Sequence, residues 1–415
     1  MLSLNGSSNG GPSTVNTGLR ELLVNQPSAP PPEFPWVGTV GKDPSILRRI
    51  LGTRTYHRLK SGYGWLRHEK KDHTDIPLGR KLRMWRRGFF AESAVLYDLP
   101  RNDPGDYVSD YTRAARCAEI NSHNEFFTHK MVLRSFLLAM GFRQAETVAL
   151  LFEGRILSHP FGGDTRQIEP EELKHQLETS ARSYIVKPEA GAGGEDLFLL
   201  EQRDGQLVRR RGAETVAFDL GGMLRESSIG PGRGRMTLIE ERVEQGSFWQ
   251  RLFPDSANTI RLLTLWIPGE AAPIIARAVQ CIGTADSVPT DNWSAGGISV
   301  PIDLGTGMLG RGRLRPSRSN GQVAGEFLSH HPDSGTEFAG AALPGWDQVK
   351  ETVLRAAASV PFNLIAGWDV LVALDGVPII LEADGDCDID VLQVHGGLLA
   401  DPTVRRFYQE LGAVA

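Results

Sequence analysis

A strongly apolar hairpin near the C-terminus constrains the fold of this chain more than any other stretch. It reads "GWDVLVALDGVPIILEADGD", from Gly367 to Asp386. Asp375-Gly376 is the dipeptide that two-residue type I′ turns prefer, so Leu374 is predicted to face Val377 across the turn. The residues on either side are almost all apolar, which predicts two strands that are covered on both faces.

Counted outward from that turn, two carboxylates meet on one face of the hairpin. Asp369 is predicted to face Glu382, and Asp384, two residues further on, points to the same side. Facing like charges destabilise a sheet, so the pair needs a compensating cation or exposure to water. Because the strands read as buried, we predict Mg²⁺, which takes carboxylate oxygens and completes its shell with water and phosphate groups. An exposed acidic hairpin is the alternative.

A second hairpin, "YIVKPEAGAGGEDLFLL" from Tyr184 to Leu200, carries a lysine and a glycine-rich loop. Glycines let backbone amides approach a phosphate chain closely, and Lys187 at the strand end adds a positive charge. The loop joins two strands, whereas the Rossmann phosphate loop joins a strand to a helix, and no Walker sequence is present. On its own, this pattern fits an ordinary hairpin as well as a phosphate clamp.

The length and composition indicate a soluble protein with more than one lobe. At 415 residues the chain exceeds what one hydrophobic core organises, and no window approaches the apolar length of a membrane span. The N-terminus lacks the features of a secretory signal, and the three cysteines form no close pair. We therefore expect a protein of the reducing cytoplasm, without a disulfide framework or a zinc site.

The first part of the chain differs in composition from the rest. Residues 1–35 are rich in Gly, Ser, Asn and Pro and are predicted to be a disordered tail. Residues 36–120 read as a basic, mainly helical region. Beyond it, strand hairpins and helices are mixed without regular βαβ alternation, so the fold class is predicted to be α+β.

The basic character concentrates in residues 42–87, which hold 14 Lys and Arg against 4 Asp and Glu. Several aromatic residues are interleaved with these charges. We interpret the block as a solvated helical face around buried aromatics. An anionic polymer, membrane phosphates or nucleic acid is the alternative partner, and of these we do not expect nucleic acid.

Taken together, the motifs resemble one known family. The lysine strand, the glycine loop and the late acidic hairpin look like the ATP-grasp superfamily. The ordered set "IVKPEAGAGGED", "LIEERVEQ", "SANTIRLLTL", "DNWSAGGISVPID" and "GWDVLVALDGVPIILEAD" resembles, more narrowly, the sugar-transfer-associated ATP-grasp family, over roughly residues 90 to 412. The resemblance implies an ATP-grasp fold, in which two α+β lobes enclose a nucleotide. It implies an N-terminal part at 121–180, a flap subdomain at 181–245 and a C-terminal lobe with the Mg²⁺ site at 246–415.

The residues that the resemblance assigns to ATP come from three kinds of segment. Two lysines contact the phosphates, three glycines form a flap, and a hinge binds adenine through its backbone and the ribose through a side chain. They are Lys130 and Lys187 for the phosphates, Gly191, Gly193 and Gly194 for the flap, and Glu240, Glu241, Val243 and, for the ribose, Glu244.

The resemblance also assigns the metal and catalytic residues. Asp369, Glu382 and Asp384 would hold Mg²⁺, although the family pattern usually has Asn where Asp384 stands. Lys187 and Arg261 would act in catalysis, with Arg261 facing the transferred phosphate or the acceptor carboxylate. A structural ion pair is the alternative for Arg261.

The resemblance implies a ligase that joins a carboxylate to an amine at the expense of ATP, through an acyl phosphate. Its small-molecule substrates would belong to a cell-surface polysaccharide precursor or a specialised metabolite. Two alternatives stay open. One is a non-catalytic nucleotide-binding module that docks on an anionic partner through residues 42–87, and the other is a phosphotransferase whose phosphorylated product is final.

Overall fold

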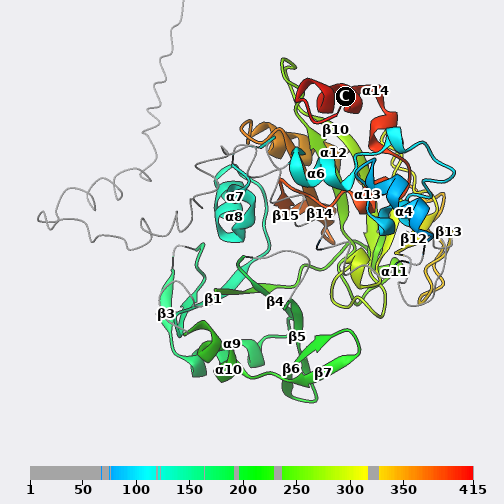
Figure 1. Ribbon diagram of the computed structural model, residues 1–415. Helices are drawn as coiled ribbons and strands as arrows, with labels where there is room; N and C mark the ends of the chain where they lie inside the picture. Colours follow the sequence, from blue (N-terminus) through cyan, green and yellow to red (C-terminus); the bar gives the residue numbers. More distant parts are fainter. Residues whose placement is uncertain are drawn as a thin grey trace, which may run out of the picture. The chain divides into compact units, whose positions relative to one another are not determined.

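The computed structural model describes one of the two units into which the chain divides, Leu51–Ala415 (Figure 1). Residues 67, 74 and 76–414 are described, apart from 118–119, 122, 163, 191–195, 229–235 and 316–326. The predicted tail at 1–35 and most of the basic block at 42–87 therefore lie outside the described residues.

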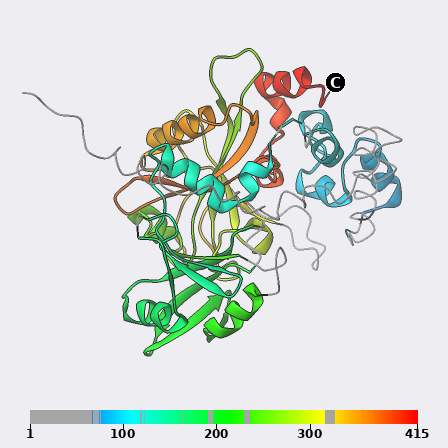
Figure 2. The same cartoon turned by 90° about the vertical axis from the view of Figure 1, so that its left-hand side faces the viewer.

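The first lobe is built on an eight-stranded antiparallel sheet with the order β3-β2-β1-β8-β4-β5-β6-β7. Helices α9 (Pro170–Thr179) and α10 (Leu220–Ser227) pack against this sheet and bury its apolar residues with their own leucines (Figure 2). The strands are β1 (Thr147–Phe152), β2 (Arg155–Ser158), β3 (Arg166–Ile168), β4 (Tyr184–Pro188), β5 (Phe198–Arg203), β6 (Gln206–Arg211), β7 (Glu214–Ala217) and β8 (Thr237–Glu241).

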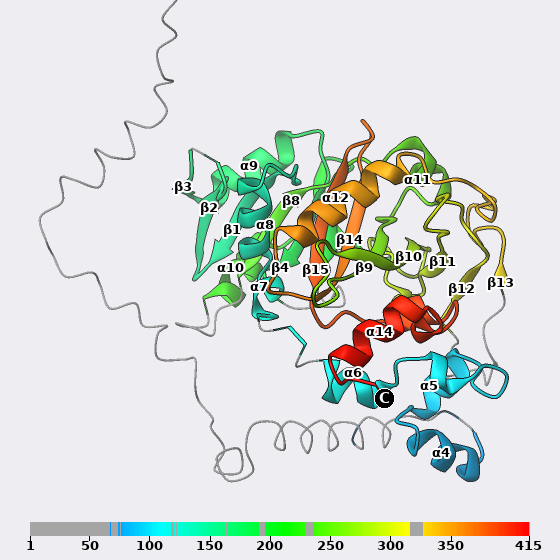
Figure 3. The same ribbon diagram turned by 90° about the horizontal axis from the view of Figure 1, so that it is seen from above.

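The second lobe contains a seven-stranded sheet with the order β13-β12-β11-β10-β9-β14-β15. Helix α12 (Trp346–Ala358) lies across β9, β14 and β15, and α7 (Glu125–Thr128) and α8 (Lys130–Ala139) contact β15 (Figure 3). The strands are β9 (Ile260–Leu265), β10 (Ile274–Ile282), β11 (Ile298–Pro301), β12 (Gly312–Leu314), β13 (Phe327–Leu328), β14 (Ile365–Val372) and β15 (Pro378–Asp384).

The remaining described helices surround the second sheet. Residues from α4, α5, α13 and α14 join one buried cluster whose members include Leu96, Leu398 and Phe407. These helices are α4 (Leu78–Trp85), α5 (Ala91–Leu96), α6 (Asp110–Ala115), α11 (Ser247–Leu252), α13 (Asp390–Gln393) and α14 (Pro402–Glu410), with short 3₁₀ turns η2 (Pro104–Asp106), η4 (Trp293–Ala295) and η5 (Leu398–Ala400).

The hairpin of β14 and β15 has the predicted carboxylate pairing but a different turn. The N–H of Ala373 donates to the C=O of Val377 (3.0 Å), and the N–H of Gly376 donates to the C=O of Ala373 (2.8 Å). Three residues therefore form the loop, with Gly376 at a φ of 83°. The prediction that Leu374 faces Val377 is wrong, because a three-residue loop ending in a left-handed glycine replaces the two-residue turn.

A second irregularity compensates for this shift. The register changes by one residue between Asp369 and Val370, at a β-bulge, so that Asp369 is again the partner of Glu382. A bulge inserts one extra residue into one strand and so restores the count that the longer loop had altered. The predicted opposition of the two carboxylates is confirmed.

The two lobes are joined by the short segment that follows β8. This segment runs from Arg242 to Gly246 and leads directly into α11. The N–H of Gly246 donates to the C=O of Val372 (3.0 Å), which ties the segment to the second sheet. The mixture of antiparallel sheets and helices in two lobes confirms the predicted α+β class. None of the described helices combines the length and apolar character needed to cross a membrane.

Candidate active site

One pocket, with a cavity volume of ≈ 330 Å³, is lined by both sheets. Strands β4 and β8 of the first lobe and strands β9, β10, β14 and β15 of the second lobe contribute residues to it. The structure brings nine of the predicted site residues together here: Lys130, Lys187, Glu240, Glu241, Val243, Arg261, Asp369, Glu382 and Asp384. Glu244 is not among the lining residues, and Gly191, Gly193 and Gly194 lie outside the described residues.

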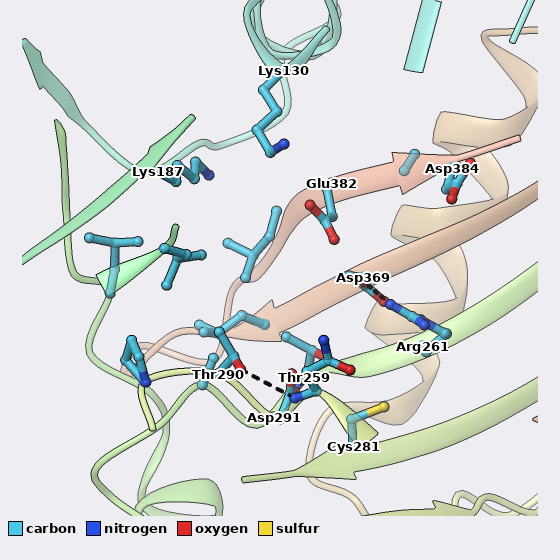
Figure 4. Close-up of a pocket in the computed structure, with 18 of the residues that line it drawn as sticks. Lys130, Lys187, Thr259, Arg261, Cys281, Thr290, Asp291, Asp369, Glu382 and Asp384 are labelled. Atoms are coloured by element: carbon cyan, nitrogen blue, oxygen red, sulfur yellow. Dashed lines mark hydrogen bonds and ion pairs between the residues drawn. The ribbon is translucent and has the colours of Figure 1, made fainter. Parts of the chain in front are cut away.

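Two lysines project into the same part of the pocket (Figure 4). Lys187 extends from β4, and Lys130 is the first residue of α8. The Lys187 ammonium lies 2.8 Å from Glu240 and the Arg134 guanidinium lies 3.1 Å from it, so Glu240 is held between two cations. Burial lowers the pKa of Lys130, while the Glu382 carboxylate opposes that change. The arrangement makes this end of the pocket a site for anionic groups.

The segment after β8 places backbone groups along the pocket. Strand β8 lies between β1 and β4, so the backbone of Glu240 and Glu241 belongs to the sheet, and the N–H of Glu241 donates to the C=O of Glu146 (2.8 Å). Val243 lines the pocket beyond the strand end, and neither its N–H nor its C=O makes a hydrogen bond with any described residue. Such groups can pair with the polar edge of a planar heterocycle.

Arg261 and Asp369 form a bidentate ion pair across β9 and β14. The guanidinium Nε lies 2.7 Å from one carboxylate oxygen, and its terminal nitrogen lies 2.6 Å from the other. Burial opposes the charge of Arg261, but Asp369 outweighs it and holds the pKa of the guanidinium well above its usual value. Paired in this way, each side chain has a fixed orientation at the pocket wall.

Glu382, opposite Asp369, has no such partner. Its side chain makes no hydrogen bond and no ion pair with any residue that the structure describes, although it is only partly exposed. Burial raises the pKa of Glu382, and the neighbouring Asp369 carboxylate raises it further, against Lys130, Arg261 and Lys187. A nearby cation would stabilise the charged form of this carboxylate.

The predicted metal ligands do not by themselves form a complete coordination shell. Asp384 is exposed at the end of β15, where it accepts a hydrogen bond from the N–H of Asp386 (2.9 Å). Within the described ranges, no three His, Cys, Asp or Glu side chains are grouped as a metal site. The donor set is nevertheless of the kind that suits Mg²⁺ bound with a nucleotide, because this ion takes one or two carboxylates and completes its shell with phosphates and water.

The far end of the pocket contains residues that sequence reasoning missed. Asp291 accepts hydrogen bonds on one carboxylate oxygen from the N–H (2.5 Å) and the hydroxyl (2.7 Å) of Thr259. Burial raises the pKa of Asp291 in spite of these bonds. Thr259 stands directly before β9, two residues before Arg261.

Two further charged residues, Arg315 and Asp388, also line the pocket. Arg315 reaches the carboxylate of Glu92 (2.8 Å), and its guanidinium lies 5.5 Å from the centre of the Trp293 ring. Nothing in the spacing of these residues indicated that they would meet, because they come from distant parts of the chain. The pocket lining therefore includes both signs of charge and an aromatic ring.

Comparison with known proteins places the chain within a family. The sequence profile of the sugar-transfer associated ATP-grasp family matches residues 117–406, well over half of the chain. No curated protein matches the sequence. Several solved structures are similar in fold at low sequence identity, among them one synthetase and two ligases.

D-cycloserine synthetase is 13% identical with a TM-score of 0.36, and the match covers 69% of this chain and 71% of that one. The D-alanine-D-alanine ligase of Coxiella burnetii is 11% identical with a TM-score of 0.35, covering 78% and 66%. The L-amino acid ligase of Bacillus licheniformis is 12% identical with a TM-score of 0.31, covering 63% of this chain and only 41% of the ligase. At these identities and TM-scores the likenesses carry no argument about function. The family match does not depend on them: the chain belongs to the sugar-transfer-associated ATP-grasp family, as its motifs predicted.

Proposed function

We propose that this protein is an ATP- and Mg²⁺-dependent ligase that joins a carboxylate to an amine through an acyl phosphate. Membership of an ATP-grasp family supports the general class of ATP-dependent ligase. One observation supports the more specific proposal of a Mg²⁺-dependent carboxylate-amine ligase. A single pocket is lined by two lysines and by Val243, whose backbone N–H and C=O make no hydrogen bond with any described residue. The same pocket is lined by a half-buried glutamate without a partner among the described residues, and by further side chains of both charges.

The nucleotide occupies the end of the pocket that faces the first lobe. Lys130 and Lys187 bind its phosphates, because they are the two ammonium groups that project into that end. Glu240 fixes Lys187 at 2.8 Å and so orients the charge before the nucleotide arrives. Val243 offers a backbone donor and acceptor to adenine. The predicted glycine loop at 191–194 follows the strand of Lys187 in the sequence and lies outside the described residues.

The residues that would hold Mg²⁺ lie on the acidic hairpin of β14 and β15. Glu382 would be the first ligand, since its oxygens have no other partner in the described structure, and Asp369 and Asp384 would supply the other carboxylates. Asp369 reaches this role while paired with Arg261, which sets the direction of its carboxylate. The ion, when bound, neutralises the charge that builds up on the phosphates during transfer.

The reaction then has two balanced steps. An oxygen of the substrate carboxylate attacks the γ-phosphorus of ATP, the bond to the β-phosphate oxygen breaks, and ADP leaves. The amine next attacks the carbonyl carbon of the acyl phosphate, the bond from that carbon to the phosphate oxygen breaks, and phosphate and a proton are released. Arg261 stabilises the negative charge at the reacting carboxylate, from its position at the pocket wall between the two ends.

The substrates are small molecules with polar groups, because the pocket lining includes the charged side chains of Asp291, Arg315 and Asp388. A precursor of a cell-surface polysaccharide or a specialised metabolite fits that chemistry. In either case the carboxylate lies near Arg261 and the amine enters from the side of Asp291. We place the protein in the cytoplasm, where ATP is available.

Trapping with hydroxylamine tests the acyl phosphate without knowledge of the amine. Purified full-length protein is incubated with ATP, Mg²⁺ and a panel of amino, hydroxy and uronic acids, and ADP release is measured. Hydroxylamine replaces the natural amine, so an acyl phosphate is converted into a hydroxamate that mass spectrometry identifies. We expect at least one acid to give ADP and hydroxamate in equal amounts.

Two controls make the test decisive. Lys187→Met is expected to lower the rate of ADP release at least 100-fold, which corresponds to about 2.7 kcal/mol of transition-state stabilisation. Lys174→Met removes an exposed lysine of α9 and should leave the rate unchanged. A phosphorylated acid that survives hydroxylamine would indicate the phosphotransferase instead. Binding of ATP with no ADP from any acid would indicate the non-catalytic module.

A further inference from the structure

We propose that the surface of α4 docks on anionic phospholipid bilayers. The surface is formed by the exposed residues Leu78, Leu82, Arg83 and Arg86, together with the flanking cations Arg80, Lys81 and Arg87, and we call it the α4 surface. It is distinct from the pocket, none of whose lining residues belongs to α4. The proposal does not depend on the proposed ligase activity.

Within the described residues, the charge of the α4 surface is not compensated by acidic side chains. Five cations lie between Ile76 and Phe90, and this stretch contains no Asp or Glu. In the part of the chain that the structure describes, no carboxylate lies within ion-pair distance of any of the five. Other described arginines have acidic partners, as Arg101 has Asp98 and Arg203 has Glu201. An unpaired cationic surface attracts an anionic partner.

Two leucines are exposed among these charges. Leu78 is 64% exposed and Leu82 is 49% exposed, one helical turn apart. At 100° per residue, Leu78, Leu82, Arg83 and Arg86 lie on the side of the helix that faces away from Met84. Met84 is buried, and it belongs to the same apolar cluster as Phe89 and Leu96. The helix is therefore anchored by one face, while the other presents leucines and arginines together.

The combination of leucines and cations decides between possible partners. A nucleic acid or an acidic polysaccharide neutralises arginines but offers no apolar layer to leucines. A second copy of the α4 surface offers leucines but brings five like charges against five. The interface of an anionic bilayer offers both, because its phosphates lie directly above acyl chains.

Sedimentation with lipid vesicles tests the proposal on the full-length protein. Vesicles of phosphatidylcholine alone are compared with an equimolar mixture of phosphatidylcholine and phosphatidylglycerol, with and without added salt. We expect the protein to bind the mixed vesicles, to bind the neutral vesicles much less, and to be released by salt. A basic residue near an anionic surface contributes about fivefold to binding, so replacing Arg80, Arg83, Arg86 and Arg87 with Gln should weaken it at least tenfold.

The leucines separate a bilayer from an anionic polymer. The double variant Leu78→Ala and Leu82→Ala should weaken binding to mixed vesicles by roughly tenfold, because two side chains lose their burial in the acyl layer. The same variant should bind heparin as the wild type does. If heparin binds the protein tightly and vesicles do not, the surface recognises a polymer and the proposal is wrong.

Matched variants control for charge and for hydrophobicity. Replacing Arg101, Arg203, Arg225 and Lys174 with Gln removes the same number of exposed cations elsewhere, each of which has an acidic partner. Replacing Leu138 and Met140 with Ala removes two exposed apolar residues from the end of α8. Both controls should bind mixed vesicles as the wild type does. Equal binding by the α4 variants and the wild type would overturn the proposal.

Discussion

Glu382 stands opposite Asp369 in the hairpin of β14 and β15, and only Asp369 has a cation in contact with it. Arg261 takes both oxygens of Asp369, and Glu382 makes no ion pair or hydrogen bond in the described structure. The two carboxylates therefore differ in charge balance although they share one ladder position. In the Mg²⁺ site that we propose, this asymmetry makes Glu382 the more sensitive position for metal binding, and it makes Asp369 the more sensitive one for stability.

Glu382→Gln should increase the Mg²⁺ concentration needed for half-maximal ADP release by 10- to 100-fold, because it removes one charged ligand and leaves the fold in place. Asp384→Asn, at the exposed end of the strand, should have a smaller effect. The measurement is a Mg²⁺ titration at saturating ATP. Asp375→Asn, in the turn of the same hairpin, is the control and should titrate as the wild type does. Identical curves for Glu382→Gln and the wild type would remove Glu382 from the metal site.

Arg261→Met should destabilise the protein by about 3 kcal/mol, because it leaves a buried carboxylate without its partner and beside a second acid. The double variant Arg261→Met and Asp369→Leu should recover most of that loss, since no unpaired charge remains. Urea unfolding followed by circular dichroism gives both free energies. Both variants should be inactive in ADP release. The double variant should therefore regain stability without regaining activity. Equal destabilisation by the single and double variants would contradict the pairing argument.

Val243 gives a test of the hinge that depends on backbone atoms. Val243→Pro removes the N–H that we assign to adenine, whereas Val243→Ala keeps it. ATP affinity, measured by calorimetry, should fall at least tenfold in the proline variant and change little in the alanine variant. Thermal unfolding of both proteins checks that the proline has not disrupted the hinge. Comparable affinity in the two variants would mean that adenine binds elsewhere.

The sequence predicted the parts of the site that depend on local pattern. The opposition of Asp369 and Glu382 followed from counting along one hairpin, and the structure agrees with it. That agreement needed two departures from the simple count, a loop one residue longer and a bulge that shifts the register back. Neither departure could be predicted from the sequence, because the Asp375-Gly376 pair suits both loop lengths.

Contacts between distant segments were beyond prediction from one sequence. Glu240 pairs with Lys187 because β8 lies beside β4, and strand neighbours of this kind cannot be read from composition. Asp291 reaches Thr259 from a loop 32 residues away. The resemblance supplied Glu240 as a hinge residue that contacts adenine through its backbone. The side chain's role beside Lys187 became visible only in the structure.

The acidic stretch that follows the hairpin provides a pH-dependent prediction. Asp390 is half-buried and accepts a hydrogen bond from the Tyr97 hydroxyl. Burial, and then the neighbouring carboxylates Asp388 and Asp110, raise the pKa of Asp390 to about 7. The pKa of Asp110 is likewise raised to about 6, chiefly by burial. In the unfolded chain both groups lose their protons near pH 4, as exposed aspartates do.

The sign of the effect follows from which state holds the proton. Between about pH 4 and about pH 7 the folded protein keeps protons that the unfolded chain has lost, so the free energy of unfolding falls as the pH rises through this range. Asp390→Asn keeps an acceptor for Tyr97 and carries no charge. It should be close to the wild type in stability near pH 4 and more stable by about 2 kcal/mol or more near pH 8, since one pKa unit corresponds to about 1.4 kcal/mol. Urea unfolding across that range measures the difference, with the exposed Asp347→Asn as the control. A constant difference between Asp390→Asn and the wild type at all pH values would show that Asp390 does not titrate in the folded protein, and that the carboxylates around it leave it charged.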